Sequence, residues 1–232
     1  RYALFVLFFP QLIAGPITRY NNMQLQFNKK FKNINYDSLI KGFFLISIGL
    51  FKKIIIADKL AVYVNENYNS IYNLGFFETW FTTVAFTLQF YFDFSGYADI
   101  AVGLGLLFFI NIPINFNSPL KSTSMIEFWQ RWHLTLTSFL TNYIYLPIIK
   151  NLNEINMKNI AISTTITFFI AGLWHGPSWN FIFFGLWNGI LIILNQMMKK
   201  TKYDYHKFVK FCVTFICINI GFIFFRSENL ND

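Results

Sequence analysis

Apolar stretches long enough to cross a lipid bilayer recur along this 232-residue chain, and they constrain its fold more than any other feature. A helix needs about 20 residues to span roughly 30 Å of hydrocarbon. The sequence therefore predicts an all-α, polytopic membrane protein with a single membrane-embedded domain over residues 1–232. The expected spans lie near residues 2–20, 39–57, 75–93, 97–114, 159–175, 178–198 and 208–225.

The composition supports this interpretation. Only 13% of the residues are charged, whereas an ordinary soluble protein carries about 25%. Because a soluble surface needs charged groups where it meets water, much of this surface is expected to meet lipid. The composition excludes a disordered chain, a disulfide scaffold and a cytosolic enzyme. Since the first residue is Arg1 rather than methionine, the chain is also expected to be a fragment of a longer protein.

The net charge of +8 comes largely from short groups of lysines between the apolar stretches. Lysine-bearing loops at 29–32, 150–158 and 199–210 are expected on the cytoplasmic side by the positive-inside rule, and the turn at 176–179 on the opposite side. Aromatic residues interleaved with basic ones can indicate binding of single-stranded nucleic acid. Here the spacing of the lysines favours membrane topology, and no nucleic-acid partner is predicted.

Two of the apolar stretches are irregular. The first holds Pro10, Gly15 and Pro16, and proline removes a backbone donor, so this segment is expected to be broken or re-entrant. The second contains Lys52 and Lys53, so either this span is shorter than its apolar length or both side chains snorkel towards water.

The segment 119–147 differs from the rest, because it is too polar for a lipid-facing span yet rich in Trp, Phe, Leu and Tyr. It is interpreted as amphipathic and interfacial, or as buried among other helices. Further on, the sequence GLWHG at 172–176 is echoed by GLWNG at 185–189. Glycine pairs at this spacing indicate close packing of helices.

Ionisable groups inside a membrane are costly, so histidines in or beside apolar segments are the first candidates for chemistry. His175 ends an apolar stretch between Trp174 and Gly176, and His133 lies within FWQRWHLTLTS. A histidine in a water-poor pocket stays neutral near pH 7 and can accept a proton from a hydroxyl. The alternative is that His175 only forms a hydrogen bond to a neighbouring helix. His206 lies among lysines and is interpreted as a solvated side chain.

Other groupings give weaker indications. Asp93 and Asp99 would face different ways on a regular helix, so acting together would require a break at Gly96; helix pairing or capping is the favoured interpretation for Asp93. Cys212 and Cys217 fall on different helix faces, which predicts neither a disulfide nor a metal site. No metal-binding or nucleotide-binding motif is found in the sequence.

Five motifs, taken together and in this order, resemble the membrane-bound O-acyltransferase (MBOAT) family. They are FFPQLIAGPITRY (8–20), FDFSGYADIAVGLGLL (92–107), INFNSP (114–119), EFWQRWHLTLTSFLTNYIYLPI (127–148) and GLWHGPSWNFIFFGLWNG (172–189). The resemblance covers nearly the whole chain. It is greatest to the bacterial branch that includes the membrane subunit of alginate O-acetylation, the peptidoglycan O-acetyltransferase and the D-alanyl transfer protein of teichoic acid synthesis.

The resemblance implies a multi-helix bundle around a central funnel or tunnel, with an acyl thioester donor on the cytoplasmic side and an acceptor reached from the other side. It also implies that the family's catalytic histidine is His175 and that its second site position is His133. Two places depart from the close relatives: Thr141 and Asn142 replace an Arg-Asp pair, and Ile149 and Lys150 replace two glycines. These changes concern acceptor or partner contacts more than the chemistry at His175.

The resulting hypothesis is a multi-pass protein of the bacterial inner membrane that moves an acetyl group from acetyl-CoA to a hydroxyl of a cell-envelope polysaccharide. His175 would act as general base and His133 would orient the donor or polarise its carbonyl. Arg131, Trp132 and Trp174 are candidate substrate-binding groups, although packing equally explains the tryptophans. No bound cofactor is expected; membrane lipid and an extracytoplasmic partner protein are. The alternatives are a transporter or flippase, and a non-catalytic membrane scaffold.

Overall fold

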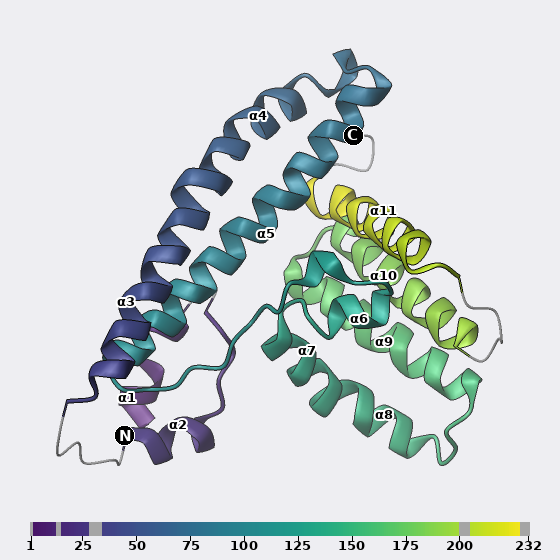
Figure 1. Ribbon diagram of the computed structural model, residues 1–232. Coiled ribbons are helices and arrows are strands. Elements are labelled where there is room, and N and C mark those ends of the chain that lie inside the picture. The colour runs from purple at the N-terminus through teal and green to yellow at the C-terminus, as the bar shows by residue number, and fades with distance from the viewer. Residues whose placement is uncertain (1, 13–14, 28–33, 200–204, 228–232) are drawn as a thin grey trace. The chain divides into compact units, whose positions relative to one another are not determined.

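The computed structural model describes residues 2–12, 15–27, 34–199 and 205–227. The chain forms two compact units, Arg1–Asn117 and Ser118–Asp232. Across the described ranges every regular element is a helix, which confirms the all-α prediction for them (Figure 1). The single domain over 1–232 stays a prediction. The lysines at 29, 30, 32, 200 and 202 lie outside the described residues.

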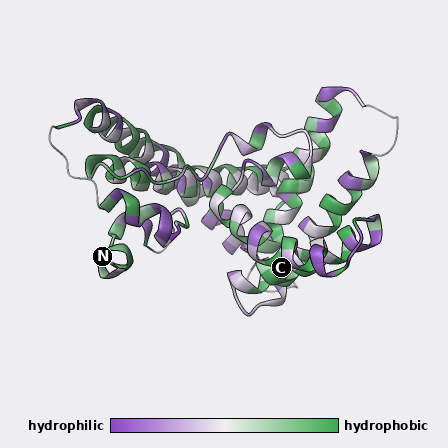
Figure 2. Ribbon diagram, turned by 90° about the horizontal axis from the view of Figure 1, so that it is seen from below, coloured by the Kyte–Doolittle hydropathy of each residue, from purple (hydrophilic) through white to green (hydrophobic). Residues whose placement is uncertain are grey.

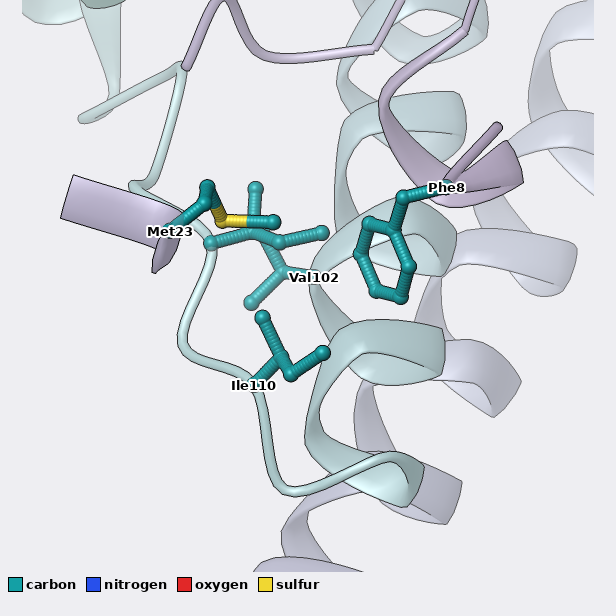
Figure 3. Packing of buried hydrophobic residues seen from close by; sticks show 5 residues of the cluster. Phe8, Met23, Val102 and Ile110 are labelled. Atoms are coloured by element: carbon teal, nitrogen blue, oxygen red, sulfur yellow. The ribbon is translucent and has the colours of Figure 1, made fainter. Parts of the chain in front are cut away.

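The first unit begins with a segment that is broken, as the sequence predicts. α1 (Tyr2–Val6) and the 3₁₀ turn η1 (Phe9–Gln11) are short, and α2 (Tyr20–Phe27) follows an irregular stretch. Pro10 lies at the start of η1, where its missing N–H breaks no helical hydrogen bond. The buried side chains that join these pieces to the following helices form one cluster (Figure 3): Phe8, Met23, Val102, Ile110 and Ile112.

A long helical hairpin makes up the rest of this unit. Its first arm is α3 (Tyr36–Leu50), the π-helix η2 (Phe51–Ala57) and α4 (Asp58–Asn69), joined without a break in helical backbone. After the 3₁₀ turn η3 (Ile71–Asn73), the second arm is α5 (Phe76–Leu107). The two separate spans predicted near 75–93 and 97–114 were therefore wrong.

Close contact of glycines explains why Gly96 does not break α5. A Cβ atom on Gly49 would lie 2.5 Å from the carbonyl oxygen of Gly96, and one on Gly103 would lie 2.7 Å from that of Gly42. The two contacts are two helical turns apart on each arm, so the backbones run together over that distance. Glycine costs an isolated helix about 1 kcal/mol per residue, and here it permits a backbone approach that a larger residue would prevent.

The two lysines in the second apolar stretch are paired with aspartates of the same hairpin. Lys52 Nζ lies 2.5 Å from Asp99 Oδ2. Lys53 Nζ lies 2.8 Å from Asp93 Oδ1 and 2.9 Å from Asp58 Oδ1. The favoured interpretation of Asp93, helix pairing, is confirmed, and the aspartates neutralise cations that would be costly in an apolar setting.

The second unit opens with short helices and ends with three long ones. The 3₁₀ turn η4 (Pro119–Lys121), α6 (Met125–Trp129), α7 (Leu134–Leu140), the π-helix η5 (Thr141–Tyr145) and α8 (Leu146–Asn151) come first. α9 (Met157–His175), α10 (Trp179–Met198) and α11 (Lys207–Arg226) follow. The large side chains of α6 are buried, so the predicted alternative of burial among other helices holds for that part of 119–147.

Among the described residues, α10 and α11 are the two helices long and apolar enough to cross a membrane. They correspond to the spans predicted at 178–198 and 208–225. Figure 2 shows apolar residues running along the long helices of each unit. The crossings predicted near 2–20, 39–57 and 159–175, and the side of the membrane on which each loop lies, stay predictions.

The glycine contact between the two arms of the hairpin can be tested by adding a single methyl group. Gly49→Ala is expected to destabilise the protein by about 1–3 kcal/mol, because the new Cβ atom collides with backbone atoms of α5. Thermal unfolding in detergent micelles measures the loss. Gly75→Ala is the matched control, since its Cβ atom would meet only the end of Glu78 at 3.5 Å. Equal losses in both variants would contradict the packing argument.

Candidate active site

His175 is the last residue of α9, and the turn that follows it has a backbone that favours glycine. Gly176 has φ 156° and ψ 165°, a conformation open essentially to glycine alone. A Cβ atom there would lie 2.8 Å from the ring of Phe181. The Ser178 side chain then caps α10 by accepting from the backbone N–H of Asn180. The short turn places His175 beside the first turns of α10.

The His175 ring lies among phenylalanine rings from two other helices. Its centroid is 6.1 Å from that of Phe181 and 5.9 Å from that of Phe184, both on α10. Phe225 of α11 is closer, at 5.2 Å, with the rings edge to face. The side chain is half-buried. The imidazole is therefore held against an aromatic surface built by α10 and α11.

His133 immediately precedes α7 and is buried, with 5% of its surface exposed. Its backbone is left-handed, with φ 44° and ψ 56°. A residue other than glycine persists in that conformation only when its surroundings hold it there. Burial, with a smaller contribution from the charge of His175, lowers the pKa of His133 to about 4. The structure thus brings the two sequence-predicted histidines into electrostatic range of each other.

Arg131 is held by a carboxylate one turn before it. Its guanidinium lies 2.9 Å from Glu127 Oε1, and Glu127 Oε2 accepts from the backbone N–H and the hydroxyl of Thr123 at 2.8 and 2.9 Å. Burial works to raise the pKa of Glu127, but these hydrogen bonds and Arg131 together lower it. Arg131 is about one-third exposed, and its role in substrate binding stays a prediction.

The two candidate tryptophans lie in different environments. Trp132 is buried, with its ring stacked on Phe128 at 5.5 Å and tilted against Phe222 at 5.2 Å. Trp174 is 60% exposed and meets the His175 ring edge to face at 4.9 Å. Packing accounts for the burial of Trp132, whereas Trp174 leaves most of its surface open for contact with lipid, substrate or a partner. A substrate contact for either residue stays a prediction.

The sequence interpretation missed the phenylalanines around His175. Phe181 and Phe184 fall within the quoted motif GLWHGPSWNFIFFGLWNG, so an inspection of the residues shortly after His175 would have found them. Phe225 is distant in sequence, and only the packing of α11 on α10 brings it to the site. Asp93 and Asp99, the other candidates considered, belong to the first unit and pair with lysines.

Within the described ranges, no group of three or more His, Cys, Asp or Glu side chains is arranged to hold a metal ion. The chemistry available around His175 and His133 is that of two imidazoles and an arginine–glutamate pair, set among aromatic rings. An unprotonated imidazole accepts a proton from a hydroxyl, and a second imidazole can donate to or orient a carbonyl oxygen. This is a set of groups suited to transfer of an acyl group to an alcohol.

The low pKa of His133 predicts a specific dependence of stability on pH. The unfolded chain binds a proton at this residue below about pH 6.5, whereas the folded protein resists it until about pH 4, so stability falls as the pH drops through this window. We expect the protein to lose up to about 2 kcal/mol more than His133→Gln between pH 7 and pH 5. Thermal unfolding in micelles at the two pH values measures this. Parallel curves for the two proteins would contradict burial of a neutral His133.

Comparison with known proteins places the chain beside membrane-bound acyltransferases. The sequence profile of the membrane-bound O-acyltransferase family matches residues 1–228. The peptidoglycan O-acetyltransferase of Helicobacter pylori is 42% identical, over 100% of this chain and 44% of its own length. The probable alginate O-acetylase AlgI of Pseudomonas aeruginosa is 34% identical, over 99% and 43%.

A teichoic acid D-alanyltransferase of Bacillus subtilis is also similar, at 28% identity over 98% of this chain and 61% of its own length. The chain spans about half the length of the curated relatives that it matches.

Proposed function

The chain belongs to the membrane-bound O-acyltransferase family, and from that premise we propose that it acts in O-acetylation of a cell-envelope polysaccharide. The donor is acetyl-CoA on the cytoplasmic side of the bacterial inner membrane, and the acceptor is a hydroxyl of a polymer such as peptidoglycan or alginate. The observation that carries the proposal is that His133 and His175 lie in one unit, within electrostatic range of each other, in a chain from this family.

The degree of similarity to the relatives favours acetyl over D-alanyl transfer. The peptidoglycan O-acetyltransferase is 42% identical and the alginate O-acetylase 34%, whereas the D-alanyltransferase is 28% identical. Peptidoglycan and alginate are both carbohydrate polymers that carry free hydroxyls. The proposal therefore takes acetyl as the transferred group and a polysaccharide hydroxyl as its final destination.

In the proposed reaction, unprotonated His175 accepts the proton of the acceptor hydroxyl as its oxygen attacks the thioester carbonyl. The C–S bond then breaks, and the CoA thiolate leaves and takes up the proton from His175. The products are the acetyl ester and free CoA. The phenylalanine rings at 181, 184 and 225 exclude water from one side of the imidazole, which favours the alcohol over water as the attacking group.

The remaining candidate groups have supporting roles in the proposal. His133 orients the thioester or hydrogen-bonds its carbonyl oxygen, and Arg131 contacts an anionic part of the donor. Trp132 maintains the packing around His133, and the exposed Trp174 contacts the acceptor or its carrier. The chain lies around a central funnel, crosses the inner membrane several times, and passes the acetyl group to an extracytoplasmic partner that completes the transfer.

Replacement of His175 tests the proposal directly. His175→Ala is expected to lower acetyl transfer by about 10²–10⁴-fold, the usual contribution of a general base. The measurement is transfer of labelled acetyl from acetyl-CoA to membrane or envelope material in membranes that contain the protein. His206→Ala is the control, because this histidine caps the start of α11 and is exposed. Its rate should stay within about twofold of the unaltered protein.

Normal acetyl delivery by the His175→Ala protein would remove the proposal. A protein that moved substrate across proteoliposomes without consuming thioester would instead be a transporter. A protein whose activity survived replacement of both His133 and His175, provided that its complex still assembled, would be a scaffold.

A further inference from the structure

The motif GLWNG (185–189), which the proposed chemistry does not use, lies where three other elements meet α10. Its first glycine, Gly185, faces α9, and a Cβ atom there would collide with the carbonyl oxygen of Phe168. Trp187 donates its indole N–H to the carbonyl of Cys217 on α11 at 2.9 Å. Asn188 points to α6. This one turn of helix therefore contacts α6, α9 and α11 (Figure 1).

Asn188 is fully enclosed and uses both ends of its side-chain amide. Its exposed fraction is 2%. Its Oδ1 accepts from the indole N–H of Trp129 at 3.1 Å, and its Nδ2 donates to the carbonyl of Phe184 at 2.8 Å. Trp129 is itself 6% exposed. A buried indole N–H left without a partner is costly, so this hydrogen bond fixes where Trp129 lies.

Asn188 is connected to His133 through Trp129 and the turn that follows α6. Trp129 is the last residue of α6, and the chain continues to His133 through a tight turn. The backbone N–H groups of Arg131 and Trp132 both donate to the carbonyl of Phe128, at 2.9 and 2.8 Å. Rigid turns of this kind transmit a displacement of α6 to the next residue.

At the other end of α6, Asn195 Oδ1 accepts from the backbone N–H of Met125 at 2.7 Å. Asn188 and Asn195 lie two helical turns apart on α10, so they share one face of that helix. The two amides thus hold both ends of α6 on α10.

Asn188 is also connected to His175, through Phe184. The carbonyl that it bonds belongs to Phe184, whose ring lies 5.9 Å from the His175 ring and 5.2 Å from Phe225. Trp129 also packs against Phe184 at 6.4 Å. The same turn of α10 therefore contacts the aromatic support of His175 and anchors the helix that carries His133.

We propose that Asn188 is a positioning residue that sets the separation of His133 from His175 through its hydrogen bond to Trp129. The proposal rests on the function proposed above, and it assigns the second motif of the chain, GLWNG, to the geometry of the site formed by the first, GLWHG. Small displacements of reacting groups can cost about 10²-fold in rate, so a lost anchor affects turnover more than donor binding.

Four variants test the proposal in the full-length protein. Asn188→Leu removes the acceptor, and Trp129→Phe removes the donor. Asn188→Asp tests for rescue: burial favours the protonated carboxylic acid, which keeps an acceptor for Trp129 and a donor for the Phe184 carbonyl. It also serves as the second variant if the leucine protein folds poorly. Trp187→Phe is the matched control, because it removes an indole hydrogen bond of similar length from the adjacent residue, one that leads to α11 instead of α6.

Two measurements are made on each protein. The first is kcat and KM for acetyl-CoA, with the unfolding temperature as a check on stability. The second is the rate at which diethyl pyrocarbonate modifies His133, followed by mass spectrometry of the peptide that contains it. This second readout needs no acetyl transfer, and it reports whether His133 leaves its buried position.

We expect Asn188→Leu and Trp129→Phe to lower kcat by about ten- to hundredfold with KM within about twofold, and to speed the modification of His133. Asn188→Asp should recover most of kcat. Trp187→Phe should lose comparable thermal stability. Its kcat, and the slow rate at which its His133 is modified, should stay as in the unaltered protein. Unchanged kcat in Asn188→Leu, equal loss in Trp187→Phe, or unchanged modification of His133 would each overturn the proposal. If the unaltered protein transfers no acetyl group, the proposed function fails, while the modification rates still decide the positioning role.

Discussion

The close approach of α9 and α10 is the contact on which the second unit depends. At Gly172 and Gly185 the two backbones lie so near that a single Cβ atom on either would collide with a carbonyl of the partner helix. Inside lipid, helices gain little from the hydrophobic effect, so van der Waals contact between small residues does much of the work of association. Because α9 ends at His175, the distance between the backbones of α9 and α10 determines where the His175 imidazole lies beside α10.

Polar side chains are placed by a second constraint, since a medium poor in water makes an unpaired polar group costly. Lys52 and Lys53 are matched by aspartates from α5 and from the start of α4. In the second unit, Asn188 satisfies the indole of Trp129. The lysine pairs with α5 and the bond between Asn188 and Trp129 join different helices, so the need to satisfy these polar groups also fixes which helices meet and in what register.

Part of the fold and the candidate site could be predicted from residues that are close together in the sequence. The break after α1 follows from the prolines, the approach of α9 and α10 from the spaced glycines, and the choice of His133 and His175 from the cost of ionisable groups in apolar segments. Long-range pairing was not predictable. The sequence does not show that Asp99 will meet Lys52, or that Phe225 will reach His175, because both depend on how separate helices pack. The two spans predicted on either side of Gly96 are one helix in the structure, because Gly96 allows close contact with the neighbouring arm and does not interrupt the helix.

The two histidines are held by different physical means. His175 ends a rigid hairpin whose position is set by the size of residues at Gly172 and Gly185, so its placement is sensitive to added volume. His133 follows a five-residue helix and has a left-handed backbone, so its placement relies on directional hydrogen bonds that anchor α6. Packed helices can slide past each other by small amounts, whereas a short helix held at both ends by directional hydrogen bonds cannot. The position of His133 is therefore fixed by the two amides on α10 that anchor α6, and Asn188, which holds the end of α6 nearest His133, sets the turn that carries this residue.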